Sequence, residues 1–151
     1  MYKILFIILF IFSVGCSSHV DKKPKQKSTY LDKKHFEKLD FSIVELQKVM
    51  VDQNWYYVRK DGKAIQVITD KNGEADVFKE GLARTRIDGK IGFFNKTLDI
   101  VLPAVYDYAF PFYDGIAEIC VGCKEHGVEE HRMIEGGVWK SIDRTGLIVE
   151  E

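Results

Sequence analysis

The sequence predicts an all-β domain of repeated antiparallel hairpins and meanders, with a short helix ahead of it. Two observations concern composition: Phe and Tyr are abundant, and 12 glycines outnumber 3 prolines. That balance is typical of aromatic strands joined by tight turns. The third observation is an internal repeat in the second half of the chain. Repeats of this kind are small units that bury their apolar faces by stacking on one another.

The overall composition sets limits on size and on function class. The chain has 151 residues, of which 46% are hydrophobic and 30% charged, as in a globular protein with one modest domain. The formal net charge of −1 and the pI near 6.4 speak against nucleic-acid binding. We therefore expect no nucleic-acid partner.

An apolar run near the N-terminus predicts a secretory signal. Residues 4–12, ILFIILFIF, are too few to span a bilayer, which takes about 20 residues. The run is followed by the residues SVG and then by Cys16. This arrangement resembles the bacterial lipoprotein box, in which a cysteine behind small residues is lipidated and becomes the new N-terminus.

The resemblance implies a signal peptide over residues 1–15 and a lipid anchor at Cys16, which would hold the mature chain on the bacterial cell envelope. Several acyl chains such as palmitate on one residue anchor a protein stably to a membrane. Ser17 stands where Asp would favour retention in the inner membrane, so the outer membrane is expected. An ordinary signal peptide, or a single anchor helix, is the alternative.

The next two segments lead into the domain. Residues 16–30 are rich in Lys and lack apolar periodicity, so they are expected to form a flexible, disordered tether. Residues 31–54 are expected to be helical or irregular. Apolar residues spaced three and four apart, among them Ile43, Leu46 and Met50, predict a helix over residues 42–51. This helix would pack on the domain that follows.

Residues 55–149 contain about three copies of one unit. EGLAR at 80–84 matches DGIAE at 114–118, and DGKIGFFNKT at 88–97 matches GGVWKSIDRT at 136–145. The two offsets differ by 14 residues, which predicts an insertion near residues 120–134. A partial copy, WYYVRKDGK, precedes them at 55–63.

The middle copy, EGLARTRIDGKIGFFNKTLDIVLPAVYDYAFPF, resembles the WG-repeat proteins. It departs from their pattern at Ile91, where Trp is usual, at Leu98, where Gly is usual, and at Lys140, where Gly follows the Trp. The resemblance implies an interaction module without specifying its ligand. The residues expected to form the turns and pack the repeats are Gly81, Gly89, Gly92, Pro103, Tyr106, Asp107, Gly115, Gly137, Trp139 and Gly146.

The elements of the middle copy follow from its residues. Two strands, residues 82–87 and 90–95, are expected to turn at Asp88 and Gly89, because glycine accepts the positive φ of a primed turn. A second hairpin is expected to turn near Gly136 and Gly137. Residues 100–102 would form a third strand, ended by Pro103, which has no N–H for the ladder. Aromatic side chains that recur at the repeat spacing, including Tyr108, Phe110 and Phe112, are expected to fill the space between units.

The chain has no catalytic motif. It contains neither a nucleophile elbow, a phosphate-binding loop nor a dinucleotide fingerprint, so we expect no enzyme and no cofactor. An enzyme acting on glycans would need two convergent acids. Asp107 with Asp99 or Asp114 is one option, although carboxylates at turns usually bond to the local backbone.

A Cys-x-x-Cys pair, Cys120 and Cys123, opens the insertion. Gly122 would let the chain turn sharply enough for a local disulfide, and an oxidising compartment would maintain it. The alternatives are free thiols, a thioredoxin-like redox pair, or a zinc site that adds His126 and His131. The leading hypothesis is thus an envelope lipoprotein that binds an unidentified protein or envelope component. The alternative is a metal- or redox-linked protein that uses this cluster.

Overall fold

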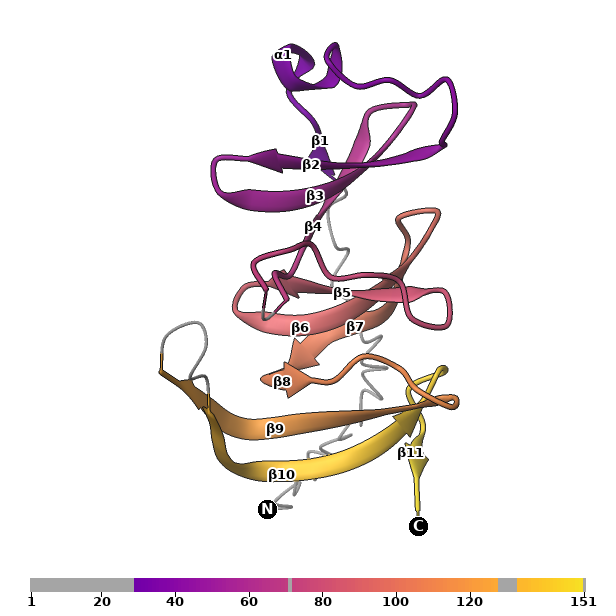
Figure 1. Cartoon of the computed structure of the whole chain (residues 1–151). Helices are drawn as coiled ribbons and strands as arrows, with labels where there is room; N and C mark the ends of the chain where they lie inside the picture. The colour runs from indigo at the N-terminus through magenta and orange to yellow at the C-terminus, as the bar shows by residue number, and fades with distance from the viewer. Residues whose placement is uncertain (1–28, 71, 128–132, 151) are drawn as a thin grey trace, which may run out of the picture.

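The computed structural model describes residues 29–70, 72–127 and 133–150, and these form three antiparallel sheets stacked one after another (Figure 1). The first sheet contains, in spatial order, β1 (Thr29–Tyr30), β4 (Lys63–Val67), β3 (Asn54–Arg59) and β2 (Leu46–Val51). The middle sheet contains β5 (Leu82–Ile87), β6 (Lys90–Asn95) and β7 (Ile100–Tyr106). The last sheet contains β11 (Ile148–Val149), β10 (Met133–Asp143), β9 (Ile116–His126) and β8 (Tyr108–Ala109). The expected mostly-β class is confirmed.

Two hydrophobic clusters hold the stack together, one on each face of the middle sheet. Successive side chains of a strand point to opposite faces, so Phe94 of β6 packs towards the first sheet and Phe93 towards the last. The cluster shared with the first sheet contains Tyr57, Val67, Ala75, Ala83, Phe94 and Leu98. The cluster shared with the last sheet contains Leu82, Ile91, Phe93, Leu102, Ala109, Phe112, Ala117, Ile119 and Ile142.

Tight turns with two left-handed residues recur at matching places in the repeat. Asp88 and Gly89 have φ of 49° and 79°, as a type I′ hairpin turn requires, so the turn expected there is confirmed. Another such turn recurs one unit apart, at Glu80–Gly81 (50° and 83°) and Asp114–Gly115 (50° and 82°). The two copies therefore share a backbone conformation as well as a sequence pattern.

A second, five-residue turn also recurs. The Asn95 side chain accepts hydrogen bonds from the N–H groups of Thr97 (3.0 Å) and Asp99 (2.9 Å), and Asp143 plays the same part at 143–147. The fourth position is left-handed in both, with Leu98 at φ 59° and Gly146 at φ 88°. Leu98 thus keeps the turn although its side chain strains it, and that side chain is buried in the first cluster.

The helix expected over residues 42–51 is wrong. Leu46–Val51 is strand β2, which pairs along its whole length with β3, and Ile43 is 92% exposed. β-branched side chains such as Val49 and Val51 suit a strand, and tertiary pairing with β3 overrides the weak helical spacing. The described helix is α1 (Lys33–Phe36), a single turn capped by Asp32, whose side chain accepts a hydrogen bond from the Lys34 N–H at 3.0 Å.

Pro103 does not end its strand. β7 continues through it to Tyr106, because β7 lies at the edge of the middle sheet and its pairing with β6 is irregular there. An edge strand with a bulge tolerates a residue without an N–H. Gly92 faces the bulge: a Cβ added to it would lie 2.7 Å from the Ala104 nitrogen. The expected packing role of Gly92 is therefore a close backbone approach.

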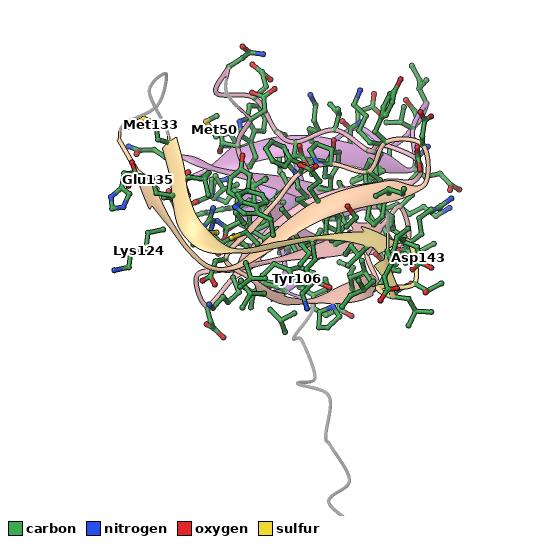
Figure 2. The ribbon with its side chains drawn as sticks, turned by 90° about the horizontal axis from the view of Figure 1, so that it is seen from below. Met50, Tyr106, Lys124, Met133, Glu135 and Asp143 are labelled. Carbon is green, nitrogen blue, oxygen red and sulfur yellow. The ribbon has the colours of Figure 1, made fainter. Side chains whose placement is uncertain are left out.

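The insertion lengthens the last hairpin. In the middle sheet, Ile87 and Lys90 are the last pair before a two-residue turn. Val121 of β9 and Val138 of β10 form the equivalent pair in the last sheet. Residues 122–137 therefore replace that two-residue turn. We call these residues the arm; 128–132 lie outside the described residues. The arm bends towards the middle sheet (Figure 1), and Lys124, Glu135 and Met133 follow one another along it, with Met133 at its outer described end (Figure 2).

The hairpin turn expected near Gly136 and Gly137 is wrong. Gly136 and Gly137 are both left-handed, with φ of 70°, but they lie inside β10. Gly122, opposite them in β9, also has a positive φ of 83°. Because left-handed residues face each other across the two strands, the hairpin bends at this point without closing. Pairing resumes at Cys123 and Gly136.

Several expectations fall outside the described residues. These are the signal peptide, the lipid anchor at Cys16 and the tether as far as residue 28. Within the described ranges, no helix is long and apolar enough to cross a membrane.

Candidate functional site

Three aromatic rings gather on the outer face of the last sheet, and we call them the aromatic face. They are Tyr108 of β8, Phe110 just after β8, and Trp139 of β10. Tyr108 and Trp139 both pair with Cys120 of β9, and directly opposed residues of an antiparallel sheet project to the same side. The opposite face of this sheet contributes Ala109 to the core, so Phe110 and Trp139 lie on the outer side, while the partly buried Tyr108 also packs against the core cluster.

The rings contact one another in geometries that aromatic pairs prefer. Phe110 and Trp139 are stacked, with ring centroids 5.9 Å apart and planes 30° apart. Tyr108 meets Phe110 edge-on at 5.2 Å and Trp139 edge-on at 6.1 Å. Phe110 remains 42% exposed and Trp139 41% exposed. The result is a contiguous aromatic surface open to solvent.

Polar groups border the aromatic face. Glu118 and Ser141 pair across β9 and β10 two residues from the Cys120–Trp139 pair, and therefore share its side of the sheet. A shallow pocket of about 620 Å³ adjoins Trp139. Its lining residues are Glu118, Trp139, Lys140, Ser141, Ile148, Val149 and Glu150. Hydrogen-bond donors and acceptors thus stand beside exposed rings.

The expected thiol pair lies beside the aromatic face. The backbones of β8 and β10 are two strand spacings apart, about 9.6 Å, yet the Tyr108 and Trp139 rings approach to 6.1 Å. The rings therefore lean together over Cys120, which is fully buried. Gly137 leaves room for this thiol, since an added Cβ there would lie 2.6 Å from the Cys120 Sγ.

Cys120 and Cys123 point to the same side of β9. Residues three apart in a regular strand would face opposite ways, but the left-handed Gly122 between them breaks the alternation. Burial, followed by a hydrogen bond to the Cys120 thiol, raises the pKa of Cys123 to about 11. The structure holds both as free thiols, so the disulfide that the spacing favoured is not formed in it.

The zinc ligand set is not brought together in the described part. His126 is exposed near the end of β9, and His131 lies outside the described residues. Among residues that are described, no three His, Cys, Asp or Glu side chains gather as a metal site would require. Of the three expected ligands that can be placed, only the two thiols lie together.

Asp107 ties the base of the arm to the middle sheet. Its carboxylate accepts hydrogen bonds from the Lys90 ammonium and from the Gly122 N–H at 2.7 Å, and these two contacts lower its pKa. Asp99, considered as its partner in an acid pair, bonds instead to Lys63 at 2.8 Å and Thr97 at 2.6 Å in a separate turn. Each carboxylate therefore has its own structural partners.

The other expected repeat residues have packing roles. The Gly115 N–H donates to the Glu80 carboxylate of the preceding copy, at 3.0 and 3.2 Å. Tyr106 packs against the second cluster, and burial raises its pKa. A Cβ at Gly146 would lie 2.9 Å from Leu102. These contacts join neighbouring units.

Sequence reasoning missed two features. Arg84 of β5 and Asp76 of the segment before it form a buried ion pair, for which the only signal was the arginine within the expected strand 82–87. Phe110 was expected to fill the space between units, and its exposure corrects that expectation. The alternation of Tyr108, Ala109 and Phe110 around the buried Ala109 is the signal that could have revealed the outer face.

Comparison with known proteins agrees with the repeat. Residues 91–124 match the family model described as WG containing repeat, so the chain carries a WG-containing repeat from β6 into the arm. No curated protein and no solved structure matches the chain. The match itself assigns neither an activity nor a ligand.

Proposed function

We propose that this chain is a non-enzymatic binding module, held on the bacterial cell envelope by a lipid anchor at Cys16, and that it binds its partner through the aromatic face. The observation that carries the proposal is the pair of contacting, exposed rings of Phe110 and Trp139. Exposed aromatic rings supply apolar contact area for a partner, and these two rings lie against each other instead of being scattered singly.

The energetics support a binding role. A fully buried aromatic side chain removes roughly 150–250 Å² from water. With about 40% of Phe110 and Trp139 still exposed, covering them would remove about 60–100 Å² each, or about 2 kcal/mol per ring. A partner that covers both rings gains this free energy, because folding does not bury the rings completely.

The anchor and the tether fit the same proposal. A lipidated Cys16 would give the module a membrane partner, with the outer membrane as the favoured location. Residues 17–28 would separate the domain from the lipid surface. An envelope component then lies within reach of the aromatic face without any need for a catalytic centre.

Co-sedimentation with insoluble envelope material tests the binding role. The chain from residue 16 onward, carrying Cys16→Ser so that neither the apolar run at 4–12 nor the lipid is present, is mixed with purified envelope and centrifuged. We expect it to sediment, and Trp139→Ala or Phe110→Ala to reduce the bound fraction about tenfold. Tyr113→Ala is the matched control, because Tyr113 is 78% exposed but lies outside the aromatic face. Equal sedimentation of the Trp139→Ala chain would contradict the proposal.

A redox- or metal-linked function is the second candidate, favoured by the hydrogen-bonded, buried thiols of Cys120 and Cys123. Metal analysis of the purified chain, with alkylation of denatured protein before and after reduction, tests it. Labelling only after reduction would support a redox pair, and bound zinc would support a metal site. Full labelling of metal-free protein without reductant would rule out both.

A further inference from the structure

The size of the aromatic face limits what can cover it. The exposed parts of Phe110 and Trp139 amount to roughly 120–200 Å², whereas a stable protein interface buries about 800 Å² on each partner. The adjoining pocket of about 620 Å³ lies within the range of small-ligand sites. A compact ligand, or a narrow chain of which a short length is held, fits this surface better than a folded protein.

The ring geometry favours a ligand with a flat apolar face. Phe110 and Trp139 are stacked on each other with their planes 30° apart, so a flat ligand can stack on the outer face of one ring, with the second ring behind it. The face of an aromatic ring carries the negative part of its quadrupole. It therefore attracts C–H groups with slight positive charge, such as those on one face of a pyranose sugar.

The surrounding charges favour a hydroxyl-rich ligand over an anion. Of the polar residues that line the pocket, Glu118 and Ser141 share the face of Trp139, whereas Lys140 pairs with Ile119 and so belongs to the opposite face. A carboxylate beside the ring does not suit a phosphate or an acidic head group. Carboxylates accept hydrogen bonds from sugar hydroxyls, and the Ser141 hydroxyl can donate to their oxygens.

From these three features we infer that the aromatic face is a saccharide-binding site. A sugar ring stacks on the exposed side of Trp139, which Phe110 supports, and its hydroxyls bond to Glu118 and Ser141 at the edge. This inference rests on the proposed function, because it names the chemical class of ligand for the same surface. A protein or a lipid surface is the competing occupant.

Titration of the Cys16→Ser chain from residue 16 onward with three trisaccharides, of N-acetylglucosamine, of β-linked glucose and of α-linked glucose, tests the inference. The chain has two tryptophans, so a Trp55→Phe background assigns the fluorescence change to Trp139. We expect at least one probe to give a saturable change with a Kd at or below about 1 mM.

Calorimetry with matched variants locates the site. Trp139→Ala should raise the Kd at least tenfold and Glu118→Gln several-fold, whereas Tyr113→Ala should leave it unchanged. Circular dichroism of each variant checks that the fold is intact.

Two outcomes would overturn the inference. One is the absence of saturable binding by all three probes at about 5 mM, well above a Kd of about 1 mM. The other is binding that survives Trp139→Ala in a folded chain. If envelope sedimentation still depends on Trp139 in either case, only the saccharide assignment fails. If sedimentation is also independent of Trp139, the proposed function fails with it.

Discussion

Asp76→Ala would leave the guanidinium of Arg84 buried without its counter-charge. Arg84 Nη2 lies 2.6 Å from one carboxylate oxygen of Asp76, and Nε lies 3.0 Å from the other. Arg84 Nη1 also donates to the Ala109 carbonyl of β8 at 2.8 Å. The Tyr57 hydroxyl of β3 donates to the Asp76 carbonyl at 3.1 Å. The pair thus connects all three sheets at one point.

The expected loss of stability is large. Both side chains are almost fully buried, with residue exposures of 4% for Asp76 and 8% for Arg84, and removing one member of such a pair costs about 3–5 kcal/mol. For a domain of this size that corresponds to a fall in Tm of roughly 10–20 °C. Replacing both residues, in Asp76→Ala with Arg84→Met, removes the uncompensated charge and should cost clearly less than the two single losses combined.

Thermal and urea unfolding of the two single variants and the double variant measure this coupling. The matched control is Glu45→Ala, since Glu45 and Lys60 form an exposed pair 3.7 Å apart that should contribute less than about 1 kcal/mol. A loss below about 1 kcal/mol for Asp76→Ala, or strictly additive single losses, would refute the view that this pair stabilises the stack.

Three further predictions concern other parts of the chain. Gly89→Val should lower the Tm, because Gly89 has φ 79° and a β-branched residue is strained there; an unchanged Tm in a thermal melt would count against the turn. Cys16→Ser should give an unprocessed or soluble product on cell fractionation, and normal processing with membrane retention would contradict the lipid anchor. The raised pKa of Cys123, about 11, means that the unfolded chain ionises this thiol first; stability should therefore be unaffected below about pH 8.5 and fall towards pH 11. A Cys123→Ser chain that loses the same stability over that range would show another cause.

Local signals predicted most of the fold. Asp88 and Gly89 specify a primed turn wherever they occur between two strands, and the repeat offsets placed the same hairpins in two units. Residues 46–51 were misassigned because their side-chain spacing allows both a helix and a strand. Their partner, β3, decides between the two, and that pairing is a tertiary contact that spacing does not contain.

The arm shows why matching motifs can differ in structure. Gly136 and Gly137 align with the turn at Asp88 and Gly89, and they keep the left-handed conformation. Gly122 on the facing strand lets the hairpin continue past these two glycines. This continuation depends on the pairing of β9 with β10 further along the arm. Pro103 is a similar case, because its tolerance depends on β7 being an edge strand.

The candidate site was only partly predictable. The sequence identified Trp139 and the two thiols, but it did not reveal that Phe110 is exposed or that Tyr108 and Trp139 lean together over Cys120. These facts depend on which face of the last sheet meets the middle sheet. Burial of Ala109, Ala117 and Ile119 shows which face of the last sheet meets the middle sheet. This burial results only from the stacking of whole units.

The indole N–H signals of the two tryptophans offer the most direct test of where a partner binds. Trp55 is a built-in reference, because its indole N–H donates to the Gly73 carbonyl at 2.9 Å, remote from the aromatic face. Enzymatically solubilised envelope fragments are added to the labelled full chain, and nitrogen–proton correlation spectra are recorded. We expect the Trp139 signal to shift while the Trp55 signal stays in place. Binding that moves other signals and leaves Trp139 unchanged would contradict the assignment of the aromatic face as the binding surface.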